Sequence, residues 1–266
     1  MRFRVLGPVE IATVEGNPAT PKALKLRSLL AYLCMHRGEA VSSSRLIEAL
    51  WSGAPPRTAS TALHVYVSKL RKHLESIGLD ASSVITTQPP GYRLNLGDHS
   101  LDVSELDTLL ATAAELRQHG CPEKASQIFG RAVSLWRGRA FEDLRDLSVF
   151  ESIGRQLDER LTFAQEQRFE IELELGNHKE IIGELYSLVD DRPTWENLHG
   201  YLMLALYRGG RTAEALSTFG RIRRNLVTEL GIEPAPRLQR LHHAVLTHDP
   251  SLGACGADVL VGSDGW

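Results

Sequence analysis

The stretch TASTALHVYVSKLRKHL, residues 58–74, constrains the fold of this chain more than any other. On a helical wheel of about 100° per residue, its large apolar side chains fall on one side. They are Leu63, Val67, Leu70 and Leu74. The opposite side holds no acidic residue. It presents Thr61, His64, Val65, Ser68, Lys69 and Lys72. Hydroxyls, an imidazole, lysines and a bare valine suit the base edges and phosphates of a DNA groove. The same pattern also fits an ordinary amphipathic helix with a basic end. The choice between these two interpretations depends on the flanking segments.

The segments around this helix have the order of a winged helix-turn-helix. Apolar spacing and Gly/Pro turn signals predict the remaining elements. In chain order they are a strand over residues 2–11 that bends at Gly7-Pro8, helices over residues 23–36 and 44–51, and β runs over 84–87 and 92–96 around the turn 89–91. Thr58 is expected to cap the third helix. In this arrangement the third helix enters the major groove and the hairpin lies against the neighbouring backbone.

The second half of the chain is rich in helix-forming residues and almost free of strand signals. Gly120, Gly176 and Gly210 are each followed by a small or apolar residue and, four positions later, by a large apolar one. The last two glycines lie 34 residues apart, which is the period of a tetratricopeptide helix pair. Such pairs bury their faces only by stacking on one another, so the pattern predicts a small helical array.

The expected fold class is therefore mainly α. We expect a winged helix with a small β-sheet and a wing hairpin over residues 1–98 and an all-α, tetratricopeptide-like array over residues 99–250. The Gly-rich residues 251–266 are expected to form a flexible C-terminal tail.

Composition and motifs argue against several other classes of protein. Residues 1–100 hold 12 basic against 7 acidic residues, whereas residues 101–266 hold 18 against 26, so the two halves suit different partners. The three cysteines are widely spaced, which disfavours a disulfide framework or a zinc site. No phosphate-binding loop, dinucleotide fingerprint or nucleophile elbow occurs, so no enzymatic activity and no cofactor or metal is expected. The acidic pair Glu142-Asp143 is expected on a solvated surface.

Two sets of segments resemble a known family. VLGPVEI, LRSLLAYL, VSSSRLIEALW, LHVYVSKLRKHL and TTQPPGYRL resemble the OmpR-type winged helix, in the version found in the SARP family of Streptomyces antibiotic regulatory proteins. SLWRG, LMLALYRGGRTAEALSTF and ELGIEPAPRLQRLHHAVL resemble the bacterial transcriptional activation domain that follows it in that family. Because the segments occur in order over most of the chain, the combination is more specific than any single piece.

The resemblance, together with the helix pattern, implies a set of DNA-contacting residues. They are Thr61, His64, Val65, Ser68, Lys69, Arg71, Lys72, Thr87 and Arg93. Trp51 and Tyr92 match positions that usually serve packing. Relatives often carry Arg at the wing tip, where this chain has Gln88, which keeps a hydrogen-bond donor but lacks the charge, so no strong insertion into the minor groove is expected there.

For the whole protein, the resemblance implies a cytoplasmic transcriptional activator with no membrane partner. Its expected partners are promoter DNA, as direct repeats near the −35 region, and RNA polymerase with its sigma factor. A side-by-side homodimer on DNA is also implied, as is a role in a secondary-metabolite gene cluster. Two alternatives stay open: a helical-repeat interaction scaffold, and an effector-binding regulator with weak DNA binding.

Overall fold

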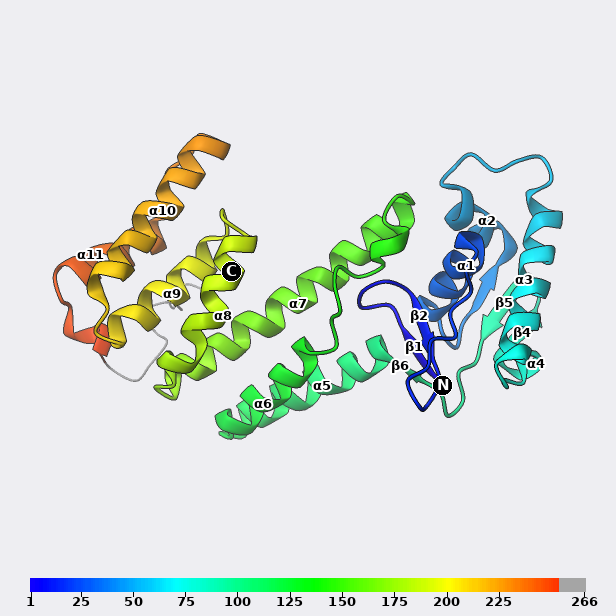
Figure 1. The fold of residues 1–266 in the computed structure, drawn as a ribbon, viewed down its shortest axis with the longest axis horizontal. Helices are drawn as coiled ribbons and strands as arrows, with labels where there is room; N and C mark the ends of the chain where they lie inside the picture. Colours follow the sequence, from blue (N-terminus) through cyan, green and yellow to red (C-terminus); the bar gives the residue numbers. More distant parts are fainter. Residues whose placement is uncertain (254–266) are drawn as a thin grey trace. The chain divides into compact units, whose positions relative to one another are not determined.

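The computed structural model describes residues 1–253 and divides into two compact units. The first unit comprises Met1–Leu110 and Arg131–Thr162; within the described residues, the second comprises Ala111–Gly130 and residues 163–253. The division falls within three helices, which are α5 (Asp102–Gln118), α6 (Pro122–Val133) and α7 (Ser148–Glu174) (Figure 1). The expected fold class is confirmed, since the described chain is mainly helical, with small sheets near its N-terminus.

The chain opens with a three-stranded sheet in the order β2-β1-β6. Strand β1 (Arg2–Arg4) pairs antiparallel with β2 (Glu10–Ala12) and parallel with β6 (Ser100–Leu101). The expected single strand over residues 2–11 is thus two strands, because the chain reverses around Gly7-Pro8 instead of bending. Phe3 and Ile11 are partners in the register and both are fully buried, which fixes the inner face of the sheet.

The winged helix follows as predicted from the sequence. Its helices are α1 (Leu24–Met35), α2 (Ser43–Trp51), α3 (Ala59–Ser76) and the short α4 (Ala81–Val84). Its sheet has the order β3-β5-β4, from β3 (Ala40–Ser42), β4 (Ile85–Gln88) and β5 (Gly91–Leu94). The side chain of Ser42 accepts a hydrogen bond from the Arg45 amide and caps α2. Thr58 makes no such bond to α3, so that expectation is wrong: its ψ of 14° departs from the extended backbone of a capping residue.

The apolar stripe of α3 forms part of the core of the first unit. Leu63, Leu70 and Leu74 are 0% exposed and Val67 is 2% exposed. This stripe packs against α1 and α2, which supply Leu29, Leu33, Leu46 and Leu50 among their buried side chains. Because the stripe is fully covered, the opposite side of α3 must face outward.

The wing hairpin depends on one glycine. β4 and β5 are joined by Pro89-Pro90 alone, with Gln88 opposite Gly91 in the register. Gly91 also pairs with Ser42 of β3, and a Cβ atom placed on it would lie 1.9 Å from the Val41 carbonyl oxygen. Only glycine therefore lets β3 approach β5 this closely beside the turn of the wing.

A segment from the second half of the chain completes the first unit. The amide groups of Arg137 and Phe141 donate to the carbonyl oxygens of Leu6 and Val5, at 2.9 and 3.0 Å. Asp143 accepts from the Val9 amide at 2.8 Å and pairs with Arg27 at 2.6 Å, so this acid is a tether and not a freely solvated group as expected. The bounds of the first unit consequently differ from a division of the chain at residues 98–99.

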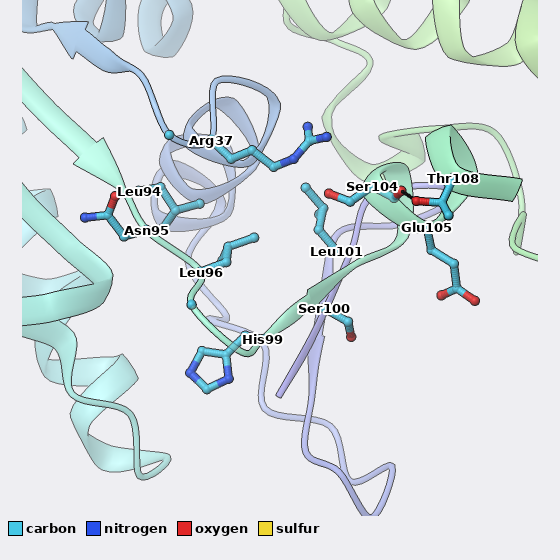
Figure 2. Close-up of a pocket in the computed structure, with 12 residues that line it drawn as sticks. Arg37, Leu94, Asn95, Leu96, His99, Ser100, Leu101, Ser104, Glu105 and Thr108 are labelled. Atoms are coloured by element: carbon cyan, nitrogen blue, oxygen red, sulfur yellow. Dashed lines mark hydrogen bonds between the residues drawn. The ribbon is translucent and has the colours of Figure 1, made fainter. Parts of the chain in front are cut away.

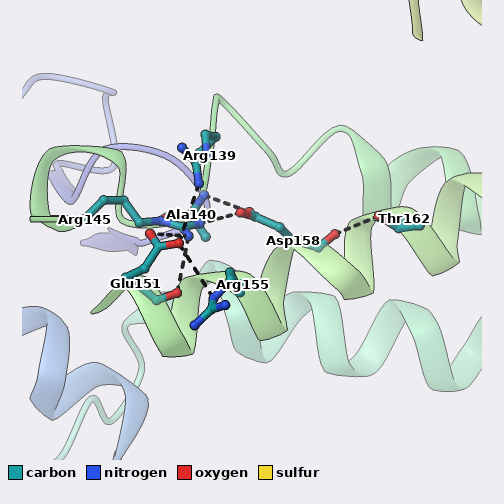
Figure 3. Close-up of polar contacts among 7 residues, drawn as sticks. All are labelled: Arg139, Ala140, Arg145, Glu151, Arg155, Asp158 and Thr162. Atoms are coloured by element: carbon teal, nitrogen blue, oxygen red, sulfur yellow. Dashed lines mark hydrogen bonds and ion pairs between the residues drawn. The ribbon is translucent and has the colours of Figure 1, made fainter. Parts of the chain in front are cut away.

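A largely covered arginine, Arg145, anchors this segment to the start of α7 (Figure 3). The Arg145 side chain is only 10% exposed, and its Nε donates to the Ala140 carbonyl oxygen at 2.6 Å. Its Nη1 lies 3.1 Å from a Glu151 carboxylate oxygen, and its Nη2 pairs with Asp158. Asp158 also accepts from the Ala140 amide, so the loop before α7 is held at both its amide and its carbonyl.

The second unit is a helical array. Its helices after α7 are α8 (His178–Asp191), α9 (Glu196–Arg208), α10 (Thr212–Leu230) and α11 (Pro236–Leu246). α9 packs against α8, α10 and α11 and is buried over most of its length. The core extends from Phe169 of α7 to Leu252, the fully buried residue of a short 3₁₀ turn, η2 (Pro250–Gly253). Residues 251–253 of the expected tail belong to this turn, in which only Leu252 is buried, and residues 254–266 lie outside the described part of the chain.

The glycine repeat that predicted the array corresponds to its turns. Gly120, Gly176 and Gly210 all have positive φ angles, of 71°, 80° and 75°, which end the preceding helices in the left-handed region. The small and large apolar residues that follow them point into the core, as Ala125 (0% exposed) and Phe129 (1% exposed) illustrate on α6.

Candidate nucleic-acid interface

The outward face of α3 is open to solvent within its unit. Every residue predicted to lie on it is exposed: Thr61, His64, Val65, Ser68, Lys69 and Lys72. The Val65 side chain is 44% exposed, which makes it one of the few large apolar side chains of residues 1–253 left uncovered. A single exposed valine is common on protein surfaces. Here, however, Val65 lies among hydrogen-bond donors on one face of an α-helix, and an α-helix fits into the major groove of DNA.

Up to residue 74, every charge on this face is positive. Glu75, near the C-terminal end, is the only acid within α3. Neither Lys69 nor Lys72 forms an ion pair with any residue between 1 and 253, so both ammonium groups are available to a partner. A DNA backbone would supply the missing anions.

Arg71 and Thr87, two further predicted contacts, bind each other. Arg71 Nε and Nη2 donate to the Ile85 carbonyl oxygen at 3.0 and 2.7 Å, and Nη2 also donates to Thr87 Oγ1 at 3.0 Å. Arg71 is therefore a tie between α3 and the wing. A contact of either side chain with DNA stays a prediction.

His64 is held by the wing as well. Its Nδ1 lies 2.7 Å from the Tyr92 hydroxyl, and the two rings meet edge-to-face with centroids 6.3 Å apart. Tyr92 is 5% exposed, as expected of a packing residue, but the sequence pattern gave no sign of its hydrogen bond.

The remaining positions singled out in the sequence differ in their exposure. Arg93 lies on β5 opposite Thr86 and Ala40, and its Nε is buried without a hydrogen-bond partner. Gln88 is exposed at the tip of the wing. Trp51 packs at 6.0 Å from the Tyr66 ring, with the Lys25 ammonium 5.3 Å from its centroid, in agreement with a packing role.

A separate hollow of about 700 Å³ lies in the first unit beyond the wing strand β5 (Figure 2). Its lining includes Arg37, His99, Ser104 and Thr108. Arg37 already pairs with Asp107 at 3.0 Å, and the Thr108 hydroxyl donates to the Ser104 carbonyl oxygen at 3.1 Å. Burial, helped by the N-terminal ammonium, lowers the pKa of His99. None of the residues that line this hollow belongs to the predicted DNA contacts.

Other chemistry finds little support in the described part of the chain. Residues 1–253 contain no cluster of His, Cys, Asp or Glu side chains arranged to hold a metal ion. His242 of α11 instead stacks on the Phe219 ring at 3.9 Å. None of the helices in this range is both long and apolar enough to cross a membrane.

Comparisons with known proteins place these features in a family. The bacterial transcriptional activator domain matches residues 101–246, and the C-terminal domain of transcriptional regulatory proteins matches residues 19–94. Regulatory protein DnrI of Streptomyces peucetius is 35% identical over 266 residues, which span 97% of both chains. Regulatory protein AfsR of Streptomyces coelicolor is 35% identical over 258 residues, which are 97% of this chain and 25% of AfsR.

A solved structure shares the fold. Mycobacterium tuberculosis EmbR, in complex with a low-affinity phosphopeptide, superposes with a TM-score of 0.86 at 32% identity, covering 98% of this chain and 68% of that chain. In sequence, the transcriptional regulatory protein EmbR is 34% identical over 248 residues. The match covers 93% of this chain but only 64% of EmbR, so the chain spans less than two thirds of that relative.

The fold and these matches define a transcriptional regulator built from an OmpR-type winged-helix domain and a bacterial transcriptional activator domain. Within that class, the chain belongs to the SARP family, together with DnrI and AfsR.

Proposed function

We propose that this protein is a sequence-specific DNA-binding activator that reads the major groove with the outward face of α3. The observation that carries the proposal is the solvent-exposed, cationic surface of that helix, in which Lys69 and Lys72 have no ionic partner among residues 1–253. Thr61, His64, Val65 and Ser68 would contact base edges, and the lysines would hold phosphates.

Membership of the SARP family supports a wider role for the protein. The protein would act in the cytoplasm, binding direct repeats near the −35 region of promoters, as two protomers side by side. It would recruit RNA polymerase with its sigma factor, at genes of a secondary-metabolite cluster. The relatives' names support regulation of transcription, and the rest of this scheme is our proposal.

Removing the lysine charges tests the groove assignment. Wild-type protein is first used to select its preferred sites from a duplex DNA library with a randomised centre. Lys69→Ala and Lys72→Ala should then weaken binding to the selected duplex, and each should lower the slope of log K against log salt by about 0.9, the value for one lost phosphate contact. Fluorescence anisotropy across a salt series measures both quantities.

The control is Lys124→Ala, which removes the same charge from an exposed position on α6. It should leave the affinity and the salt slope unchanged. Wild-type protein that selects no sequence at all would instead favour the scaffold alternative, and unchanged binding by both α3 variants would refute the assignment of this face.

A further inference from the structure

We propose that Tyr92 positions the reading residue His64, so that the His64 Nε2–H group donates to a hydrogen-bond acceptor on a base edge. The inference rests on the proposed function, because it specifies how one residue of the α3 face is aimed. It assigns to Tyr92 a part in sequence selectivity although the residue itself is 5% exposed and belongs to the wing.

The geometry fixes which His64 nitrogen is free. Nδ1 lies 2.7 Å from the Tyr92 hydroxyl oxygen, a normal hydrogen-bond distance. His64 is exposed on α3, whereas Tyr92 is covered. With Nδ1 engaged by a covered group, Nε2 is the nitrogen left to meet a partner molecule.

The direction of that hydrogen bond follows from the surroundings of Tyr92. Among residues 1–253 the Tyr92 hydroxyl has no acceptor other than His64 Nδ1. If Nδ1 carried the proton and donated to Tyr92, the hydroxyl hydrogen of a covered side chain would be left without an acceptor, which is costly. The hydroxyl therefore donates to Nδ1, and the imidazole proton resides on Nε2.

The wing side of the contact is itself fixed. The Arg71 guanidinium lies over the Tyr92 ring, with Cζ 5.9 Å from its centroid, and binds the Ile85 carbonyl oxygen. Thr87 pairs with Tyr92 across the hairpin and accepts from Arg71. The Tyr92 hydroxyl is thus held against α3 from the wing, so the His64 ring is oriented before any DNA arrives.

An Nε2–H donor selects a particular kind of base edge. In the major groove it matches N7 or O6 of guanine, N7 of adenine or O4 of thymine, and it is mismatched with the amino group of cytosine. The predicted ligand of His64 is therefore an acceptor on a base, and a phosphate oxygen is the rival partner. The two partners differ in salt dependence and in sequence preference.

A cycle of four proteins tests the proposal: wild type, Tyr92→Phe, His64→Ala and the double variant. Tyr92→Phe keeps the buried ring and removes only the hydroxyl. Each protein is run through selection on the randomised duplex library, and its affinity for the wild-type site and for single-base variants of that site is measured. Tyr66→Phe is the matched control, since Tyr66 lies on the same helix as His64 and its hydroxyl makes no hydrogen bond within residues 1–253.

We expect Tyr92→Phe to weaken binding to the preferred site by about 3- to 10-fold, the effect of one hydrogen bond. It should also relax the preference at one base position, which His64→Ala abolishes. The double variant should match His64→Ala, the salt slope should stay unchanged, and Tyr66→Phe should behave as wild type.

The proposal is overturned if Tyr92→Phe keeps the wild-type affinity and base preference, or if its effect adds to that of His64→Ala. A salt slope lower by about 0.9 in His64→Ala would place His64 on a phosphate and also contradict it. In these outcomes the wild-type protein still selects a sequence, so the proposed function survives. A wild-type protein without any sequence preference would defeat both.

Discussion

At the residue scale, Asp102 shows most clearly how a single side chain organises the first unit. Its exposed fraction is 7%, and it is the only buried acidic residue within 1–253. Its Oδ2 accepts from the amides of Val5 and Leu6 at 2.7 and 2.8 Å, and its Oδ1 accepts from Val103 at 2.9 Å. Asp102 lies next to the expected domain boundary, and no local pattern indicated that it would be buried, because Val5 and Leu6 lie 97 and 96 positions away from it.

Asp102 should make stability depend on pH. Burial raises the pKa of its carboxyl from 3.8 to about 6, against the opposing effect of its three backbone hydrogen bonds. As pH rises from about 4, the unfolded chain loses this proton before the folded chain does, so the free energy of unfolding falls until the folded carboxyl ionises near pH 6. The loss is at most about 3 kcal/mol.

Asp102→Asn removes this titration. In urea unfolding monitored by circular dichroism at several pH values, the stability of wild type relative to Asp102→Asn should decline between about pH 4 and pH 7. Groups that titrate in both proteins cancel in that difference. A difference that stays flat over this range would show that Asp102 ionises alike in the folded and unfolded chains.

At the element scale, α3 was predictable from its sequence but its connection to the wing was not. The stripe of Leu63 and its companions follows from helical periodicity, a property of neighbouring residues, and the structure buries every member. The ties from His64 to Tyr92 and from Arg71 to Ile85 join residues 28 and 14 positions apart. Such contacts depend on where the hairpin docks, which no local pattern specifies.

The wing should be sensitive to substitution at Gly91. In Gly91→Ala the new methyl group would meet the Val41 carbonyl oxygen, so β3 and β5 must separate. We expect a loss of at least about 2 kcal/mol in the free energy of unfolding, typical of a steric clash in a core, together with weaker DNA binding from a displaced Tyr92. Chemical denaturation and anisotropy measure the two effects.

Gly183→Ala provides the comparison. Gly183 lies within α8, and a Cβ placed there meets nothing within 4 Å. This change should stabilise the protein by about 0.5–1 kcal/mol, through the higher helix propensity of alanine. Equal effects from both substitutions would mean that Gly91 is not held by the close approach of β3.

At the scale of the whole molecule, the sequence predicted the types of element better than their grouping. The spacing of Gly176 and Gly210 predicted a helical array, since each turn needs a left-handed residue and each helix a small-then-large apolar pair. Nothing in the periodicity of residues 131–162 showed that they would pack with the N-terminal sheet. Amphipathic patterns report that a segment is buried, and they do not identify the surface that buries it.

This grouping leads to a prediction about truncation. A fragment of residues 1–162 retains the whole first unit, whereas a fragment of residues 1–100 lacks Asp102 and the segment that binds Val5 and Leu6. Phe3 and Leu6, now 1% and 0% exposed, would lose part of their cover. Each large side chain that becomes exposed costs about 1.5–3 kcal/mol.

We therefore expect the fragment 1–162 to unfold cooperatively in urea and to bind the selected duplex. The fragment 1–100 should unfold at clearly lower urea concentration or aggregate, even though it contains all of α3 and the wing. Its failure would then reflect the loss of cover over the first sheet and not the loss of a DNA-contacting residue. If the two fragments proved equally stable, the winged helix would fold independently of residues 131–162, and the division expected near residue 98 would also be the boundary of the folding unit.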